Sequence, residues 1–374
     1  MAKDIRFISI AGLLSSRAVL QGVGVGDASA SPTAALLLNV LQESMGRIAT
    51  ILFAHRLGTS LEPECKMYRL AADIFNDSAM VMDCLSPMFP KPIRVGLLSL
   101  SSVLRALCGV AAGSSKASLS AHFAKWGNLA ELNAVGSLVV SHITSPLATW
   151  VALILLLTVH LTTNYLAVHA VSMTTLNRQR ANIVFSTLLD QDHTLAPRHA
   201  SKHERIFEKD GVLRWRASST ILGSCQIGIP FHSLVQNVIT SSPRNRNRTA
   251  KDANTTTITA LLHLFANEDY ILWFDPARRR AAIVLTTTAR PTAQLKAWSH
   301  ALLVAQTVNH ADSRRRVKLD DDHDAMLAIL GATLAAHSAR FDGWLERLEG
   351  AGWDVHTPSL QTKPGRRFEV RKQE

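Results

Sequence analysis

Charged residues are absent from one long stretch of the chain, residues 132–177. The densest apolar part of this stretch lies at residues 149–161. A helix of about twenty apolar residues, rising about 1.5 Å per residue, spans the hydrocarbon layer of a bilayer. The pattern therefore predicts one long membrane-embedded helix over residues 147–171, which Pro146 separates from a shorter helix before it.

Two more apolar segments precede this stretch, at residues 34–45 and 93–113. The second contains Arg105, and an arginine that faces lipid is costly. We therefore expect Arg105 to point toward Asp73, Asp77 or another acceptor inside the helical domain. Residues 121–128 place a tryptophan beside a lysine, which is typical of a membrane–water interface.

A polar helix is predicted within residues 62–90, where the proline-rich segment after Ser86 ends it. Lys66, Arg69, Asp73 and Asp77 recur at helical spacing. Their side chains share one face, with opposite charges three or four residues apart. This face is a candidate for a buried polar network.

The long apolar helix contributes two further candidates to that network, His160 and His169. They are nine residues apart, so they lie on opposite sides of a helix and do not share a site. Histidine titrates near neutral pH, which makes each an acid–base candidate. A buried hydrogen bond from each ring to a neighbouring helix is the favoured interpretation.

The second half of the chain is more polar and has the pattern of a small soluble α+β domain. Residues 270–274 and 281–285 are apolar runs around a turn, which predicts a β-hairpin. The polar, threonine-rich segment at about 240–259 is predicted to be a linker. The remaining predicted elements are short strands at 214–221 and 226–229, helices at 293–308 and 325–348, and edge strands at 352–355 and 368–370.

The predicted fold class is therefore mainly α: a membrane-associated helical domain over residues 1–204, followed by a small α+β domain over residues 205–374. With 374 residues the chain is long enough for two domains. The four cysteines form no CxxC pair or metal-ligand spacing, and no catalytic triad or dyad is recognisable. We expect neither a metal site nor an enzyme.

A net charge of +11 raises the question of nucleic-acid binding. The arginines cluster at residues 244–248, 278–280 and 314–316. No aromatic residues alternate with them, as a stacking platform for bases requires. A solvated basic surface is favoured, with membrane lipid rather than nucleic acid as the partner.

The run Gly22-Val-Gly-Val-Gly26 invites comparison with a dinucleotide-binding loop. That loop requires a preceding strand and a G-x-G-x-x-G spacing, and this sequence has neither. A tight turn between helices, or close helix packing, is the favoured interpretation.

Several of these segments together resemble the root UVB sensitive family. The glycine run continues as GVGVGDASASPTAA at residues 22–35, and the polar helix reads KMYRLAADIFNDSAM at residues 66–80. Further similar blocks are AHFAK at 121–125, NYLAVHAV at 164–171 and TLNRQR at 175–180. The resemblance covers roughly residues 10–210 well and the C-terminal half loosely.

The resemblance implies an integral or peripheral membrane protein that is linked in plants to UVB responses and vitamin B6 homeostasis. It implies no established biochemical activity, and a related family member is an expected partner in a homo- or hetero-oligomer. Family members usually carry a further segment before the glycine block, which a start at Met1 would leave out. The organelle is not indicated.

Two functional hypotheses follow. The first is a non-enzymatic membrane scaffold or interaction protein. The alternative is a carrier or binder of small anionic metabolites such as vitamin B6 vitamers. For the alternative, Asn177, Arg178 and Arg180 are the candidate ligand-binding residues, because a guanidinium binds phosphate through parallel hydrogen bonds. Pyridoxal phosphate is then the candidate ligand, whereas simple interfacial placement of the arginines is the competing interpretation.

Overall fold

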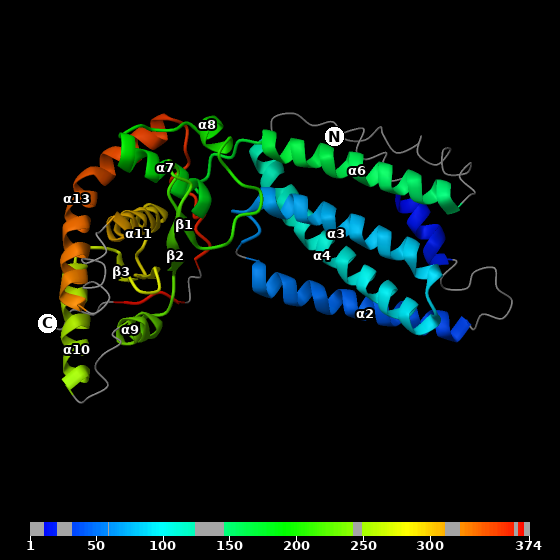
Figure 1. Cartoon of the computed structure of the whole chain (residues 1–374), viewed down its shortest axis with the longest axis horizontal. Coiled ribbons are helices and arrows are strands. Elements are labelled where there is room, and N and C mark those ends of the chain that lie inside the picture. The colour runs from blue at the N-terminus through cyan, green and yellow to red at the C-terminus, as the bar shows by residue number, and fades with distance from the viewer. Residues whose placement is uncertain are drawn as a thin grey trace. The chain divides into compact units, whose positions relative to one another are not determined.

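The computed structural model describes residues 11–20, 32–58, 60–123, 146–241, 249–310, 322–362 and 366–369. It divides into two compact units, Met1–Val171 and Ser172–Glu374, which are described separately (Figure 1). The glycine run at 22–26, the end of the predicted interfacial stretch and the start of the charge-free stretch lie outside the described residues.

The N-terminal unit consists of helices. They are a short helix Ala11–Leu20, α2 (Pro32–Leu57), α3 (Cys65–Leu85), the 3₁₀ turn η1 (Ser86–Met88), α4 (Lys91–Phe123) and α6 (Pro146–Ala170). The long α6 confirms the helix predicted over 147–171. Proline sets two boundaries: Pro87 follows the end of α3, and Pro146 occupies the first position of α6, where its missing N–H costs nothing.

Helix α3 is the packing centre of this unit, because it contacts both α4 and α6, while α2 packs on α4. Small cores fill the contacts, with Met80 against Leu153 and Leu157, and Tyr68 near Ala111. By contrast, α2, α4 and α6 each contain a segment long and apolar enough to cross a membrane, and little of each segment is buried.

The C-terminal unit is built on a four-stranded sheet in the order β1-β2-β4-β3. Its strands are β1 (Val212–Arg214), β2 (Ile221–Ile227), β3 (Tyr270–Asp275) and β4 (Arg280–Leu285). Strands β3 and β4 form the predicted antiparallel hairpin, whereas β2 pairs with β4 in parallel. Every residue of β3 and nearly all of β4 are buried, so both faces of the sheet centre are covered.

The described helices of this unit are α7 (Arg178–Gln191), α8 (Pro197–Ser201), α9 (Phe231–Thr240), α10 (Thr249–Leu264), α11 (Pro291–His310) and α13 (His323–Gly350). Among the described residues, α11 contacts all four strands and also α7 and α13, and α9 contacts β3 and β4 (Figure 1). The mainly α fold class with a small α+β part is confirmed.

The structure differs from the predictions at four places. The strands predicted at 214–221 and 226–229 are observed as Val212–Arg214 and Ile221–Ile227. The division between units falls after Val171 rather than after residue 204, because α7 packs on α11 and β1. Helix α10 occupies most of the predicted linker and packs on α13. The predicted edge strands appear only as single bridges, Thr175 with Asp354 and Thr286 with Phe368.

The core of the C-terminal unit contains two buried histidines that are held in the neutral form. The Tyr270 hydroxyl lies 3.0 Å from His300 Nδ1, and Thr333 Oγ1 lies 2.9 Å from Nε2. Because the Thr333 hydroxyl donates to a helix carbonyl, His300 Nε2 is the donor and Nδ1 the acceptor. His337 Nε2 meets Ser299 Oγ at 2.8 Å.

Burial lowers the pKa of His300 well below its usual value, and burial lowers the pKa of His337 from 6.5 to about 3. Above pH 6.5 both the folded and the unfolded chain carry these rings uncharged, and the stability is fully present. As the pH falls from 6.5 toward 3, the unfolded chain binds protons that the folded chain excludes, so stability is lost.

We predict that the free energy of unfolding of the C-terminal unit falls by up to about 1.4 kcal/mol per pH unit for each histidine below pH 6.5. Replacing His337 by Gln should reduce this slope by the contribution of one histidine. Guanidinium unfolding, followed by tryptophan fluorescence between pH 7 and 4.5, measures this slope in both proteins. An unchanged slope in His337→Gln would show that the pKa of this ring is the same in the folded and the unfolded chain.

Candidate functional site

An open cleft of about 740 Å³ lies in the C-terminal unit, along β2 and the start of α9. Five cationic side chains and one acidic side chain line it, so its formal charge is strongly positive. We call it the cationic cleft. Its charged residues are Arg178, Lys209, Asp210, Arg278, Arg280 and Arg366, and its polar residues include Ser224, Gln226 and Ser233.

Arg178, the first residue of α7, is the most rigidly held of these cations. Its Nε and Nη2 donate to the Leu360 carbonyl at 3.1 and 2.9 Å, and Nη1 pairs with Asp210. The guanidinium also lies 5.8 Å from the centre of the Trp298 ring. Since a guanidinium has five N–H donors, these three hydrogen bonds leave two donors for a ligand.

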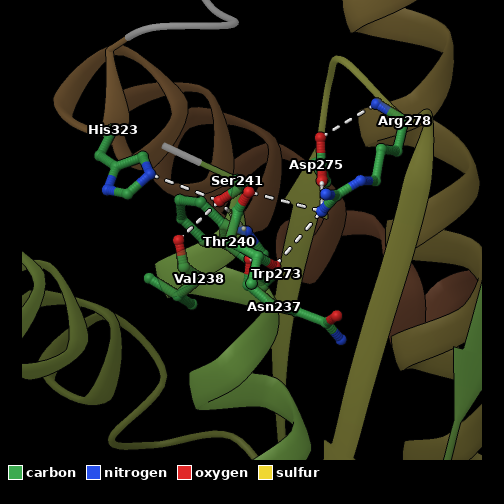
Figure 2. A network of polar contacts seen from close by, with 8 residues as sticks. All are labelled: Asn237, Val238, Thr240, Ser241, Trp273, Asp275, Arg278 and His323. Atoms are coloured by element: carbon green, nitrogen blue, oxygen red, sulfur yellow. Dashed lines mark hydrogen bonds and ion pairs between the residues drawn. The ribbon is translucent and has the colours of Figure 1, made fainter. Parts of the chain in front are cut away.

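Arg278 is anchored at the C-terminal end of α9, whereas the start of that helix lines the cleft (Figure 2). Its Nη1 lies 3.3 Å from Asp275 Oδ2 and 3.3 Å from Thr240 Oγ1, and its backbone N–H donates to Asp275 Oδ1. Ser241 beside it accepts from the Trp273 indole at 3.3 Å. The turn that carries Arg278 and leads into Arg280 at the start of β4 is therefore tied to both β3 and α9.

Two glycines allow the backbone to approach closely beside the cleft. A side chain at Gly223 in β2 would collide with the carbonyl oxygen of Arg279, and Gly211 has a φ of +73° with the Cys225 carbonyl 2.8 Å from where its Cβ would be. Only glycine adopts this arrangement without strain. The two close approaches fix β2 against β1 and against the β3–β4 turn.

Cys225 lies in the wall of the cleft but is not a nucleophile. Its side chain is buried, and burial raises the pKa of its thiol to about 12, although the Arg178 charge acts in the opposite direction. The thiolate is the reactive form of cysteine, so this thiol stays inert at neutral pH. Among the described residues, no group of three His, Cys, Asp or Glu is placed to hold a metal ion.

The structure separates the three predicted ligand-binding residues. Arg178 lines the cleft, but Asn177 caps α7, with its Oδ1 accepting from the Arg180 N–H at 2.8 Å. Arg180 is buried, pairs with buried Glu204 at 3.0 Å and contacts Thr175. Arg178 thus faces a ligand-accessible space, whereas Asn177 and Arg180 hold the segment together.

The sequence did not indicate the other cations of the cleft. Arg278 and Arg280 belong to a cluster that was interpreted as solvated surface, and Lys209 and Arg366 stand far from it in the chain. The predicted hairpin already placed residues 278–280 at a turn. The missing information was that Arg278 and Arg280 line the same cleft as Arg178, which only the three-dimensional fold supplies.

The helical unit buries the predicted polar residues of α3 against α6. His160 Nε2 lies 3.7 Å from Asp73 Oδ1 and 3.8 Å from Asp77 Oδ1, and its ring meets Asn164 at 3.0 Å. Asp73 also pairs with Arg69 at 3.2 Å. Lys66 is buried on the same helix. One histidine between two carboxylates fixes how α3 packs on α6.

Arg105 and His169 lie apart from this group. Arg105 pairs with Asp83, a different acceptor on α3, and donates to Ser15 at 2.7 Å, while Ser15 donates to Asp83 at 2.6 Å. His169 is half-buried near the end of α6, where its ring contacts Tyr165. The seven polar residues predicted for the network therefore do not form a single cluster.

Comparison with known proteins matches both parts of the chain. Residues 5–192 match the vitamin B6 photo-protection and homoeostasis domain, and residues 223–364 match the root UVB sensitive protein C-terminal domain. Protein root UVB sensitive 3 of Arabidopsis thaliana is 29% identical over 93% of this chain and 80% of its own length.

RUS family member 1 of Dictyostelium discoideum is 36% identical over 53% of this chain, and the match spans only 41% of that protein. Protein root UVB sensitive 5 of Arabidopsis thaliana is 21% identical over 94% of this chain. No solved structure matches the chain.

We predict that Arg180→Gln destabilises the C-terminal unit by about 3–5 kcal/mol, because it leaves the Glu204 charge buried without its partner. Arg340→Gln is the matched control, since Arg340 pairs with exposed Asp192 and should cost no more than about 1 kcal/mol. Guanidinium unfolding measures the loss in free energy of unfolding for both variants. Equal losses in the two variants would contradict the structural role of Arg180.

Proposed function

This chain belongs to the root UVB sensitive family, and we propose that it is a membrane-anchored interaction protein of vitamin B6 homeostasis and the UVB response rather than an enzyme. The N-terminal unit supplies the anchor, in direct contact with membrane lipid. The C-terminal unit supplies the surface for partners, among them a second family member.

The exposed apolar faces of the helical unit carry this proposal. Along α2, Leu36, Ile48 and Ile51 are 64%, 56% and 68% exposed, and on α6 Leu147 and Leu155 are 75% and 62% exposed. Only 6% of the apolar window of α2 is buried. Each Å² of apolar surface left in water costs about 25 cal/mol, and soluble monomers rarely expose large continuous apolar patches. Lipid is the medium in which such faces are stable.

The non-enzymatic part of the proposal is supported by how the reactive groups of the C-terminal unit are used. Cys225 is an inert thiol, and His300 and His337 are neutral rings hydrogen-bonded inside the core. Arg180 and Glu204 neutralise each other in a buried pair. Each group has a packing role that also explains its burial.

The alternative of a carrier requires polar groups from several spans around a shared cavity. In the described helical unit, His160 of α6 lies near Asp73 and Asp77 of α3, and Arg105 of α4 pairs with Asp83 of α3. All cations of the cleft come from the C-terminal unit. These placements favour the anchored interaction protein over the carrier.

We predict that Ile48→Lys and Leu155→Lys each reduce the membrane-inserted fraction, since a lysine at the centre of a spanning helix costs about 2.5–3.5 kcal/mol. Carbonate extraction of membranes from cells that express each variant measures that fraction. The unaltered chain should stay in the pellet. Ile239→Lys, at a 45% exposed position of α9 in the C-terminal unit, is the control and should behave as the unaltered chain.

The same substitutions distinguish lipid from water at these faces. In a water-soluble protein, lysine at a position that is more than half exposed is harmless or improves solubility. Recovery of the unaltered chain as a stable monomer without detergent, or full insertion of both helix variants, would overturn the proposed anchor.

A further inference from the structure

The cationic cleft has the properties of an anion-binding site and not only those of a basic surface. Lys209, Arg280 and Arg366 line it, and their side chains have no acidic partner within the described part of the chain. Two other exposed arginines of this unit, Arg340 and Arg347, are by contrast both paired with Asp192. Unpaired like charges around one hollow repel each other unless an anion is bound there.

The rigid part of the cleft adds directed donors to this charge. Arg178 is only 12% exposed and fixed on two sides, with two N–H donors left over. Donors that are already immobile lose little entropy when they bind a ligand. Asp210, the acidic residue of the cleft, is occupied by Arg178.

The start of α9 also faces the cleft, through Pro230 and Ser233. Pro230 occupies the N-cap position of this ten-residue helix, but its side chain makes no capping hydrogen bond to the first turn. The first N–H groups of an uncapped helix, and the positive end of its dipole, favour an anion. The positive charge of the lining side chains is the main reason to expect an anion here, and the start of α9 adds to it.

We propose that the cationic cleft binds a ligand that carries a phosphate group with at least two negative charges, held by Arg178, Lys209 and Arg280 and by the start of α9. The volume of about 740 Å³ is in the range of small-molecule sites and accommodates more than the phosphate itself. The phosphate belongs either to a free organic phosphate or to a lipid headgroup. This inference goes beyond membrane anchoring and does not depend on it.

The test uses the full chain in nanodiscs of neutral phosphatidylcholine, titrated with pyrophosphate by calorimetry. The unaltered chain should show saturable binding to one site. The double variant Lys209→Gln/Arg280→Gln should raise the Kd at least about tenfold. Both side chains are exposed, so the variant should fold, and an unchanged circular dichroism spectrum confirms it.

The matched control is Lys202→Gln/Arg279→Gln. It also removes one lysine and one arginine, and Arg279 lies in the same turn as Arg280, but neither residue lines the cleft. Its Kd should stay within about twofold of the unaltered value. An equal loss in both double variants would reveal diffuse surface charge, and no saturable binding by the unaltered chain would likewise overturn the site.

A second arm identifies the source of the phosphate. The titration is repeated in nanodiscs that contain phosphatidylinositol phosphate, with phosphatidylglycerol discs of matched charge to correct for general repulsion. A lipid headgroup in the cleft would displace pyrophosphate only in the phosphatidylinositol phosphate discs. Equal binding in the two kinds of anionic disc supports a free organic phosphate.

Discussion

The structure depends on one constraint: within the described residues, protein covers little of the apolar faces of α2, α4 and α6. The buried share of the apolar window is 6% in α2 and 22% in α4 and α6, and we propose that lipid covers the rest. Once lipid covers these faces, the features of the N-terminal unit follow. Its described backbone is helical except at short connections between helices, because a helix satisfies its own hydrogen bonds.

The same constraint explains how α3 keeps its charges. Asp73, Asp77 and Asp83 are buried between helices, where each meets a histidine or an arginine from its own or a neighbouring helix. A lone carboxylate there would be costly, so these contacts define which face of α3 meets α4 and α6. In the C-terminal unit the apolar residues are buried in the protein itself. They fill one continuous core, and five of the unit's cations line a cleft.

Local patterns were sufficient to predict α6, the β3–β4 hairpin and the mainly α fold, because each depends on a continuous apolar run or a turn. They failed for α10, whose first nine residues are mostly polar and threonine-rich, whose large apolar residues begin only in its second half, and which packs on α13 far along the chain. Arg178 and Arg180 look alike in sequence. On a helix they point in different directions, so one lines the cleft and the other lies in the core. The cleft itself joins residues from 178 to 366, which no local pattern relates.

Nitroxide scanning along α6 tests the central claim most directly. Single cysteines at residues 147–170, in a background without the four native cysteines, are labelled in nanodiscs, and spin relaxation by oxygen is compared with relaxation by a water-soluble nickel complex. We predict that labels at Val151, Ile154, Leu155 and Leu166 encounter oxygen and little nickel, while a label at Leu153 encounters little of either. Strong nickel access at these four exposed positions would show that water covers this face, and would contradict the account.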